Sequence, residues 1–147
     1  MDKTISIISK NKKTTFEIGK LIGKMLLNGG IILLSGNLGC GKTIIVKGIA
    51  SFLGIKDVIT SPTFDILKSY LINKKKKTFF YHIDAYRLKD NDDISDLEEI
   101  INNDNCVVAI EWPEKIKKII HKPFLEVLIK YGKSINSREI FFKYYGE

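Results

Sequence analysis

At 147 residues the chain is long enough to bury a core and short for a second one, so we predict a single domain over residues 1–147. Its 44% apolar and 28% charged residues are typical of a globular protein, and no apolar run approaches the roughly 20 residues of a membrane span. We find no secretory signal, and two cysteines are too few for a disulfide framework, so we expect a cytoplasmic protein. The net charge of +7 has two open explanations, a lysine-rich composition or an anionic partner such as a nucleic acid.

The first third of the chain predicts a strand, a helix, a strand and a second helix. Residues 3–9 alternate like a strand, and apolar residues then recur at helical spacing from Ile18 to Leu26 until Asn28 and two glycines end the helix. Ile31–Leu34 form a continuous apolar run, typical of a strand buried on both faces. A helix from about Lys42 to Leu53 follows a glycine-rich turn.

The rest of the chain predicts further strands and two short helices. We expect a hairpin of strands over 64–72 and 78–83, a helix over 94–101, a strand over 106–110, a short helix over 114–120, and an antiparallel pair over 124–131 and 138–145. Strands that alternate with helices favour a parallel sheet covered on both faces, to which the hairpins add antiparallel strands. The predicted fold class is therefore α/β, with three layers around a mixed, mainly parallel sheet with antiparallel hairpins.

The glycine-rich turn is the strongest signal in the sequence. Residues 36–43, GNLGCGKT, fit the pattern G-x-x-x-x-G-K-[ST] at every fixed position. In such a P-loop, successive backbone N–H groups wrap a phosphate, and the following helix adds its positive end. We expect Lys42 to clamp the β- and γ-phosphates and the Thr43 hydroxyl to ligate Mg²⁺. The sequence therefore predicts a P-loop NTPase that binds ATP with Mg²⁺.

Two acidic residues follow apolar runs at the ends of predicted strands. Asp84 follows Phe79–Ile83, and Glu111 follows Val107–Ile110. Ligands of open α/β folds bind at the carboxyl edge of the sheet, so both acids should lie near the P-loop. P-loop enzymes need such acids to hold the metal or to order the attacking water. An ordinary polar strand end remains the alternative for each of them.

Three further residues have both a functional and a structural explanation. Thr63 follows Pro62 in a stiff turn, and it is either a sensor of the γ-phosphate in a switch-like loop or a simple loop residue. Trp112 directly follows Glu111 and would lie near the nucleotide, although core packing is its default role. His82 alternates with its neighbours on a strand, and we expect a packed residue rather than a metal ligand.

Four motifs in a fixed order resemble one family. GNLGCGKT is followed by SPTF at 61–64, HIDAYRL at 82–88 and IEWPE at 110–114. In this order and spacing, roughly residues 10–140 resemble TsaE, a family of bacterial ATPases required for the threonylcarbamoyladenosine modification of tRNA. The resemblance implies a weak ATPase that acts on the TsaD and TsaB proteins, and that resets their complex rather than forming the modification bond. A contact with tRNA itself would be weak or indirect.

The resemblance also implies roles for individual residues. Asp84 would order or activate water, Lys42 would clamp the phosphates, and Thr63 would act in the switch-like loop. Thr43 and Glu111 would hold Mg²⁺. The residues expected around the nucleotide are Asn37, Leu38, Gly39, Cys40, Gly41, Lys42, Thr43, Trp112, Arg138 and Lys12. The chain departs from the family pattern at Ala85, where a larger apolar residue is usual, and at 97–101, which lack the usual leucine-glycine pair; both departures concern partner contacts.

Three other functions are alternatives to this one. A signalling GTPase would need an N-K-x-D guanine reader, and residues 73–76 carry Lys in place of the Asp. A small P-loop kinase usually clamps phosphoryl groups with several arginines, whereas this chain has only Arg87 and Arg138. A nucleotide-binding regulator without useful hydrolysis stays open, although it would not need both acids. The sequence also leaves open how Asp84 and Glu111 divide their roles and whether the lysines at 74–77 touch tRNA.

Overall fold

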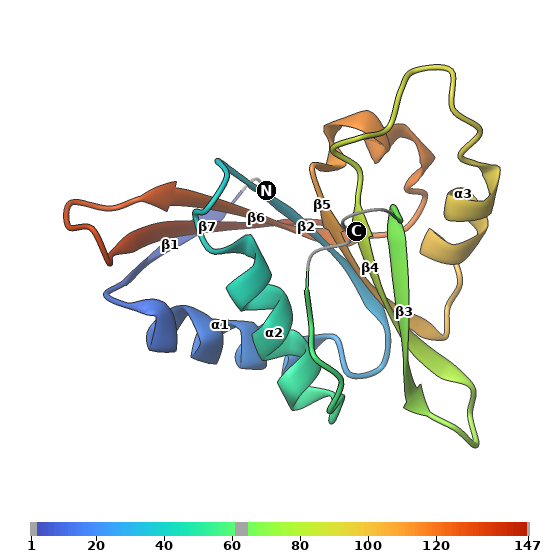
Figure 1. The fold of residues 1–147 in the computed structure, drawn as a ribbon, viewed down its shortest axis with the longest axis horizontal. Coiled ribbons are helices and arrows are strands. Elements are labelled where there is room, and N and C mark those ends of the chain that lie inside the picture. Colours follow the sequence, from blue (N-terminus) through green and yellow to red (C-terminus); the bar gives the residue numbers. More distant parts are fainter. Residues whose placement is uncertain (1–2, 61–64, 147) are drawn as a thin grey trace.

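The structure is a computed structural model that describes residues 3–60 and 65–146. The described residues form one seven-stranded sheet in the order β1-β7-β6-β2-β5-β4-β3, with helices on both faces (Figure 1). In chain order the elements are β1 (Thr4–Ser9), α1 (Lys12–Met25), β2 (Gly30–Gly36), α2 (Lys42–Phe52), β3 (Leu67–Asn73), β4 (Thr78–Asp84), α3 (Ser95–Ile101), β5 (Cys106–Glu111), the 3-10 helices η1 (Pro113–Lys115) and η2 (Lys117–Ile119), β6 (Phe124–Tyr131) and β7 (Arg138–Tyr145).

The centre of the sheet is parallel and both of its edges are antiparallel. β2 pairs in parallel with β5 and with β6, and β5 pairs in parallel with β4. At one edge β3 is antiparallel to β4; at the other, β7 is antiparallel to β6 and β1 to β7. The predicted three-layer α/β fold with a mixed sheet and antiparallel hairpins is confirmed. The sheet was expected to be mainly parallel, but its described strands form three parallel and three antiparallel pairings, because β1 adds a second antiparallel pairing beside the β6–β7 hairpin.

One predicted helix takes a different form. Residues 114–120 were expected to be a short helix, and they form η1 and η2 instead. Trp112, just before Pro113, has a left-handed φ of 55°, so the chain enters this segment through a sharp turn. Ile116, between the two pieces, has a φ of −127°, which is outside the helical range and interrupts the segment.

Two apolar cores, one on each face, explain why the central strands are apolar throughout. α1 and α2 pack on one face, against β2 residues such as Ile32 and Leu34. α3, η1 and η2 pack on the other face, against β2 residues such as Ile31 and Leu33. Adjacent side chains of a strand point to opposite faces, so a strand covered on both sides buries all of them.

The contact between α1 and α2 depends on two glycines. A side chain on Gly48 of α2 would collide with the backbone at Phe16, and one on Gly19 of α1 would collide with the backbone at Ile45. The helices therefore approach each other closely, which fixes the amino end of α2 beside the amino end of α1. None of the helices in the described ranges is long and apolar enough to cross a bilayer.

Candidate functional site

The backbone of the P-loop favours glycine at three positions: Gly36 and Gly41, which the motif fixes, and Gly39 between them. The loop joins β2 to α2, and Gly36, Gly39 and Gly41 in it have φ values of 148°, 76° and 118°. These values lie in the region where residues with a Cβ are strained. A Cβ on Gly36 would also lie 2.6 Å from the Cys40 sulfur. Gly41 is the N-cap of α2, so the free N–H groups at the start of this helix belong to the loop.

The hairpin of β6 and β7 supports the loop from the side. The Tyr131 hydroxyl donates to the carbonyl oxygen of Leu38 at 2.7 Å, and Arg138 Nε donates to that of Cys40 at 2.9 Å. The Arg138 guanidinium also lies 4.7 Å from the centroid of the Tyr131 ring. Arg138 was predicted near the nucleotide, and the structure places it on the P-loop backbone. A direct contact between Arg138 and a nucleotide stays a prediction.

Lys42 is buried and has two partners within the protein. Its Nζ donates to the carbonyl oxygen of Gly36 at 2.7 Å and lies 3.9 Å from the centroid of the Trp112 ring. Only 5% of Lys42 is exposed, so the ammonium needs such partners to offset its lost hydration. Trp112 in turn contacts the Tyr86 ring, 5.0 Å away between centroids, and packs partly against the second core. Trp112 thus lies at the P-loop and is also a packing residue.

The two predicted acids lie side by side at the carboxyl edge of the sheet. Asp84 at the end of β4 pairs in register with Glu111 at the end of β5, which pairs with Leu34, two residues before the end of β2. Asp84 is half-buried and accepts a hydrogen bond from the Tyr86 N–H at 3.1 Å. Burial raises the pKa of the Asp84 carboxyl, while that N–H lowers it and the neighbouring Glu111 raises it further. A carboxylate with a raised pKa is a better proton acceptor.

His82 is a residue of this site whose role sequence reasoning missed. It is fully buried, as expected of a packed strand residue, and its Nε2 lies 2.6 Å from Glu111 Oε2. The pairing depends on the parallel register of β4 and β5, in which His82 lies opposite Ala109, two residues before Glu111. No local pattern in the sequence encodes that register.

The remaining predicted residues lie at different distances from the loop. Thr43 is the second residue of α2 and is half-buried. Lys12 is exposed at the start of α1. The same end of α1 approaches the P-loop, because the methyl group of Thr15 would lie 3.7 Å from a Cβ placed on Gly41. Thr63 belongs to residues 61–64 and lies outside the described residues.

The side-chain oxygens near the P-loop fit Mg²⁺ only in combination with phosphate. In the part of the chain that the structure describes, no three His, Cys, Asp or Glu side chains come together as a ready metal site. Nucleotide-bound Mg²⁺ usually takes one or two protein carboxylates and completes its shell with phosphate oxygens and water. Thr43 and Glu111, beside a loop that favours anions, match that requirement.

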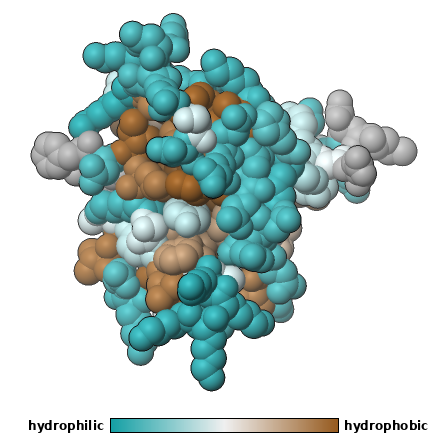
Figure 2. Space-filling model, turned by 90° about the vertical axis from the view of Figure 1, so that its right-hand side faces the viewer, coloured by the Kyte–Doolittle hydropathy of each residue, from teal (hydrophilic) through white to brown (hydrophobic). Residues whose placement is uncertain are grey.

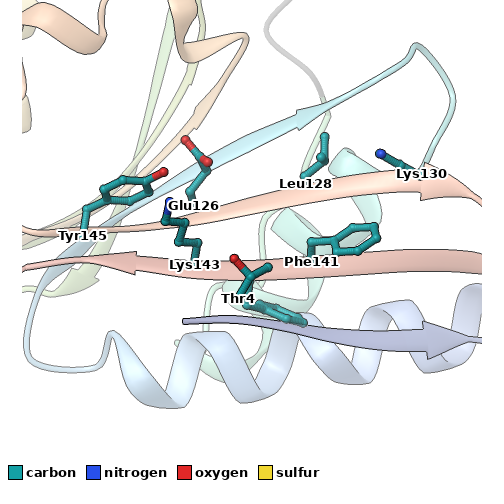
Figure 3. Close-up of a pocket in the computed structure, with 8 residues that line it drawn as sticks. Thr4, Glu126, Leu128, Lys130, Phe141, Lys143 and Tyr145 are labelled. Atoms are coloured by element: carbon teal, nitrogen blue, oxygen red, sulfur yellow. The ribbon is translucent and has the colours of Figure 1, made fainter. Parts of the chain in front are cut away.

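A separate cavity lies on the β1–β7–β6 part of the sheet, on the face opposite to α1 and α2 (Figure 3). It is lined by Thr4, Glu126, Leu128, Lys130, Phe141, Phe142, Lys143 and Tyr145. None of the predicted site residues is among them. The predicted site residues therefore do not belong to this cavity.

The chain is similar to proteins of one kind. Residues 9–140 match the family described as "Threonylcarbamoyl adenosine biosynthesis protein TsaE". A protein of Nostoc sp. named tRNA threonylcarbamoyladenosine biosynthesis protein TsaE is 37% identical over 141 residues, which cover 90% of this chain and 82% of that protein. One of the same name from Rickettsia prowazekii is 39% identical over 123 residues, 82% of each chain. The crystal structure of Bacillus subtilis YdiB has a TM-score of 0.81 at 30% identity and covers 99% of this chain and 88% of its own.

Proposed function

Because the chain belongs to the TsaE family of tRNA threonylcarbamoyladenosine biosynthesis proteins, we propose that it is a cytoplasmic Mg²⁺-dependent ATP-binding protein and weak ATPase that acts on a complex of TsaD and TsaB. One observation carries the proposal. Lys42, Asp84 and Glu111 come from three separate elements and meet at the edge of the sheet that carries the P-loop. A purely structural P-loop would not need two carboxylates there.

The chain's own residues would bind the triphosphate through charge and backbone donors. The N–H groups of the loop and the amino end of α2 favour an anion. Lys42 would exchange the Gly36 carbonyl and the Trp112 ring for the β- and γ-phosphates, which are stronger partners for an ammonium ion. Thr43 and Glu111 would hold Mg²⁺, which neutralises charge on the phosphates. Asp84 would accept a proton from the attacking water.

The positions of the two arginines predict that the chain alone hydrolyses ATP slowly. Arginine fingers contribute about 10³–10⁵ to the rate in related phosphoryl-transfer enzymes. Arg138 donates to the carbonyl oxygens of Cys40, Ile135 and Ser137, so its guanidinium is already engaged. Arg87 is exposed, three residues beyond Asp84. We therefore propose that partner proteins stimulate hydrolysis.

Phosphate release with and without partners tests this function. The purified chain should hydrolyse ATP slowly, and addition of TsaD with TsaB should raise the rate. ATP binding without phosphate release in either condition would favour the nucleotide-binding regulator instead. Transfer of the γ-phosphate to a small molecule, with no free phosphate, would favour the kinase.

We predict that ATP or ADP changes the fluorescence of Trp112, the only tryptophan in the chain. The Lys42 ammonium lies 3.9 Å from the ring centroid and would leave the ring when it meets phosphate. The measurement is a fluorescence titration alongside calorimetry, with Lys42→Ala, which should not bind ATP tightly, as the control for a fluorescence change that does not depend on binding at the P-loop. A flat titration under conditions where calorimetry detects binding would contradict the contact between Trp112 and the nucleotide site.

The lysine run at 74–77 gives a second prediction, which concerns tRNA. These residues are exposed in the turn between β3 and β4, at the lower end of Figures 1 and 2. That turn precedes β4, so it lies at the opposite end of the strand from Asp84. If four lysines meet phosphates, the log–log slope of affinity against salt is roughly −3 to −4. Replacing all four with Gln should weaken tRNA or complex binding and leave ATP affinity unchanged.

The control for this variant removes the same charge elsewhere. It replaces four other exposed lysines, namely Lys24, Lys56, Lys118 and Lys133. Affinities are compared at low and physiological salt. Equal tRNA and partner affinities for wild type and the 74–77 variant at both salts would mean that these lysines are only a solvated turn.

A further inference from the structure

His82 and Glu111 form a buried pair on the P-loop side of the sheet. His82 is 0% exposed and Glu111 is 3% exposed, and the two atoms in contact, Nε2 and Oε2, are 2.6 Å apart. Phe80, two residues before His82 on β4, belongs to the core beneath α1 and α2, so His82 faces the same side. A buried carboxylate needs hydrogen-bond donors, and His82 supplies one to Glu111.

The surroundings of His82 determine which nitrogen carries the proton. A carboxylate only accepts hydrogen bonds, so Nε2 must be the donor toward Glu111. Nδ1 is buried and has no partner among the described residues. His82 therefore donates to one oxygen of Glu111 through Nε2.

This contact leaves the two oxygens of Glu111 in different situations. Oε2 is held by a ring that is buried on β4, opposite the small Ala109 of β5. Rotation of the carboxylate would break that bond, so the bond restricts Oε1 to one direction. Groups that hydrogen-bond to a metal-ligating carboxylate commonly raise metal affinity by 10–100-fold, because the ligand needs no reorientation when the ion binds.

We propose that His82 is a positioning residue for the nucleotide's Mg²⁺: it holds Glu111 so that Oε1 is free to ligate the ion. The inference rests on the proposed function and adds a residue to it. His82 does not touch the metal or the nucleotide. Its effect therefore belongs to the Mg²⁺-dependent part of ATP affinity and not to the metal-free part.

Calorimetry with ATP, in EDTA and across a Mg²⁺ series, tests the inference on three variants. His82→Phe keeps a planar buried ring and removes the donor, and it should weaken Mg²⁺ affinity about 10–100-fold while metal-free ATP affinity stays within about twofold. His82→Gln keeps an N–H donor at the end of a side chain long enough to reach Glu111, and it should retain most of the Mg²⁺ effect. The matched control is Phe80→Leu, which perturbs the same strand and face further from the site and should leave the Mg²⁺ effect unchanged.

A double-mutant cycle with Glu111→Gln separates positioning from general disturbance. If His82 acts through Glu111, His82→Phe adds no further loss of Mg²⁺ affinity in the Glu111→Gln background. Additive losses, or a silent His82→Phe in a protein whose Mg²⁺ response depends on Glu111, would overturn the inference. If His82→Phe does not fold, His82→Asn takes its place, because the shorter amide does not reach Oε2 and should lose what Gln keeps. A wild type with no Mg²⁺ response at all would refute the proposed function instead.

Discussion

Lys42→Ala should abolish tight ATP binding, with a loss of roughly 10²–10⁴-fold in affinity. The estimate follows from two charge-assisted hydrogen bonds to the β- and γ-phosphates, each contributing about 1.5–3 kcal/mol. Lys42 is buried beside the loop carbonyl of Gly36 and the ring of Trp112, which together hold its ammonium at the P-loop. Isothermal titration calorimetry with ATP, with and without Mg²⁺, measures the loss.

Two further variants separate loss of the phosphate clamp from loss of structure. Lys42→Met keeps most of the hydrocarbon stem in the buried position and should lose affinity like Lys42→Ala. Lys47→Ala removes a lysine from the exposed side of the same helix and should bind ATP like wild type. Thr43→Ala should weaken mainly the Mg²⁺-dependent part of the affinity. Unchanged ATP affinity in Lys42→Ala would overturn the assignment of the P-loop.

The parts of the fold that depend on local pattern could be predicted from the sequence. The P-loop is defined by eight consecutive residues, and its glycines have the positive φ values that the motif requires. The positions of Asp84 and Glu111 also followed, because the carboxyl ends of parallel strands meet at one edge of the sheet. The helices and strands came from periodicity, with the largest difference at 114–120, where Trp112 and Pro113 impose a turn.

The contacts that tune the site depend on residues far apart in the chain, and sequence periodicity does not encode them. Arg138 reaches the carbonyl of Cys40 across 98 positions, because the hairpin of β6 and β7 returns to the side of the loop. Lys42 meets Trp112 only because β5 lies directly beside β2. His82 meets Glu111 only in one register of β4 against β5, and a shift of one residue would place His82 on the other face of the sheet.

The contrast between the two carboxylates of the site leads to the second large expected effect. Glu111 is 3% exposed and hydrogen-bonded by a buried imidazole, an arrangement suited to a fixed metal ligand. Asp84 is only half-buried, and burial raises the pKa of its carboxyl, an arrangement suited to a proton acceptor. These environments favour Asp84 as the residue that activates water and Glu111 as the residue that holds Mg²⁺.

Asp84→Asn should therefore retain ATP affinity and lose hydrolysis by about 10²–10⁴-fold, the usual contribution of general acid–base catalysis. The amide can still accept the Tyr86 N–H but cannot take a proton from water. Because burial disfavours the charged carboxylate, the neutral amide should not lower the Tm, so lost turnover cannot be ascribed to unfolding. Glu111→Gln should instead lose mainly the Mg²⁺ dependence of binding, since an amide is a poor ligand for a hard cation. Two measurements test these effects: phosphate release at saturating ATP with the partner proteins, and calorimetry across a Mg²⁺ series. Swapped phenotypes would exchange the two roles, and two silent variants would refute both.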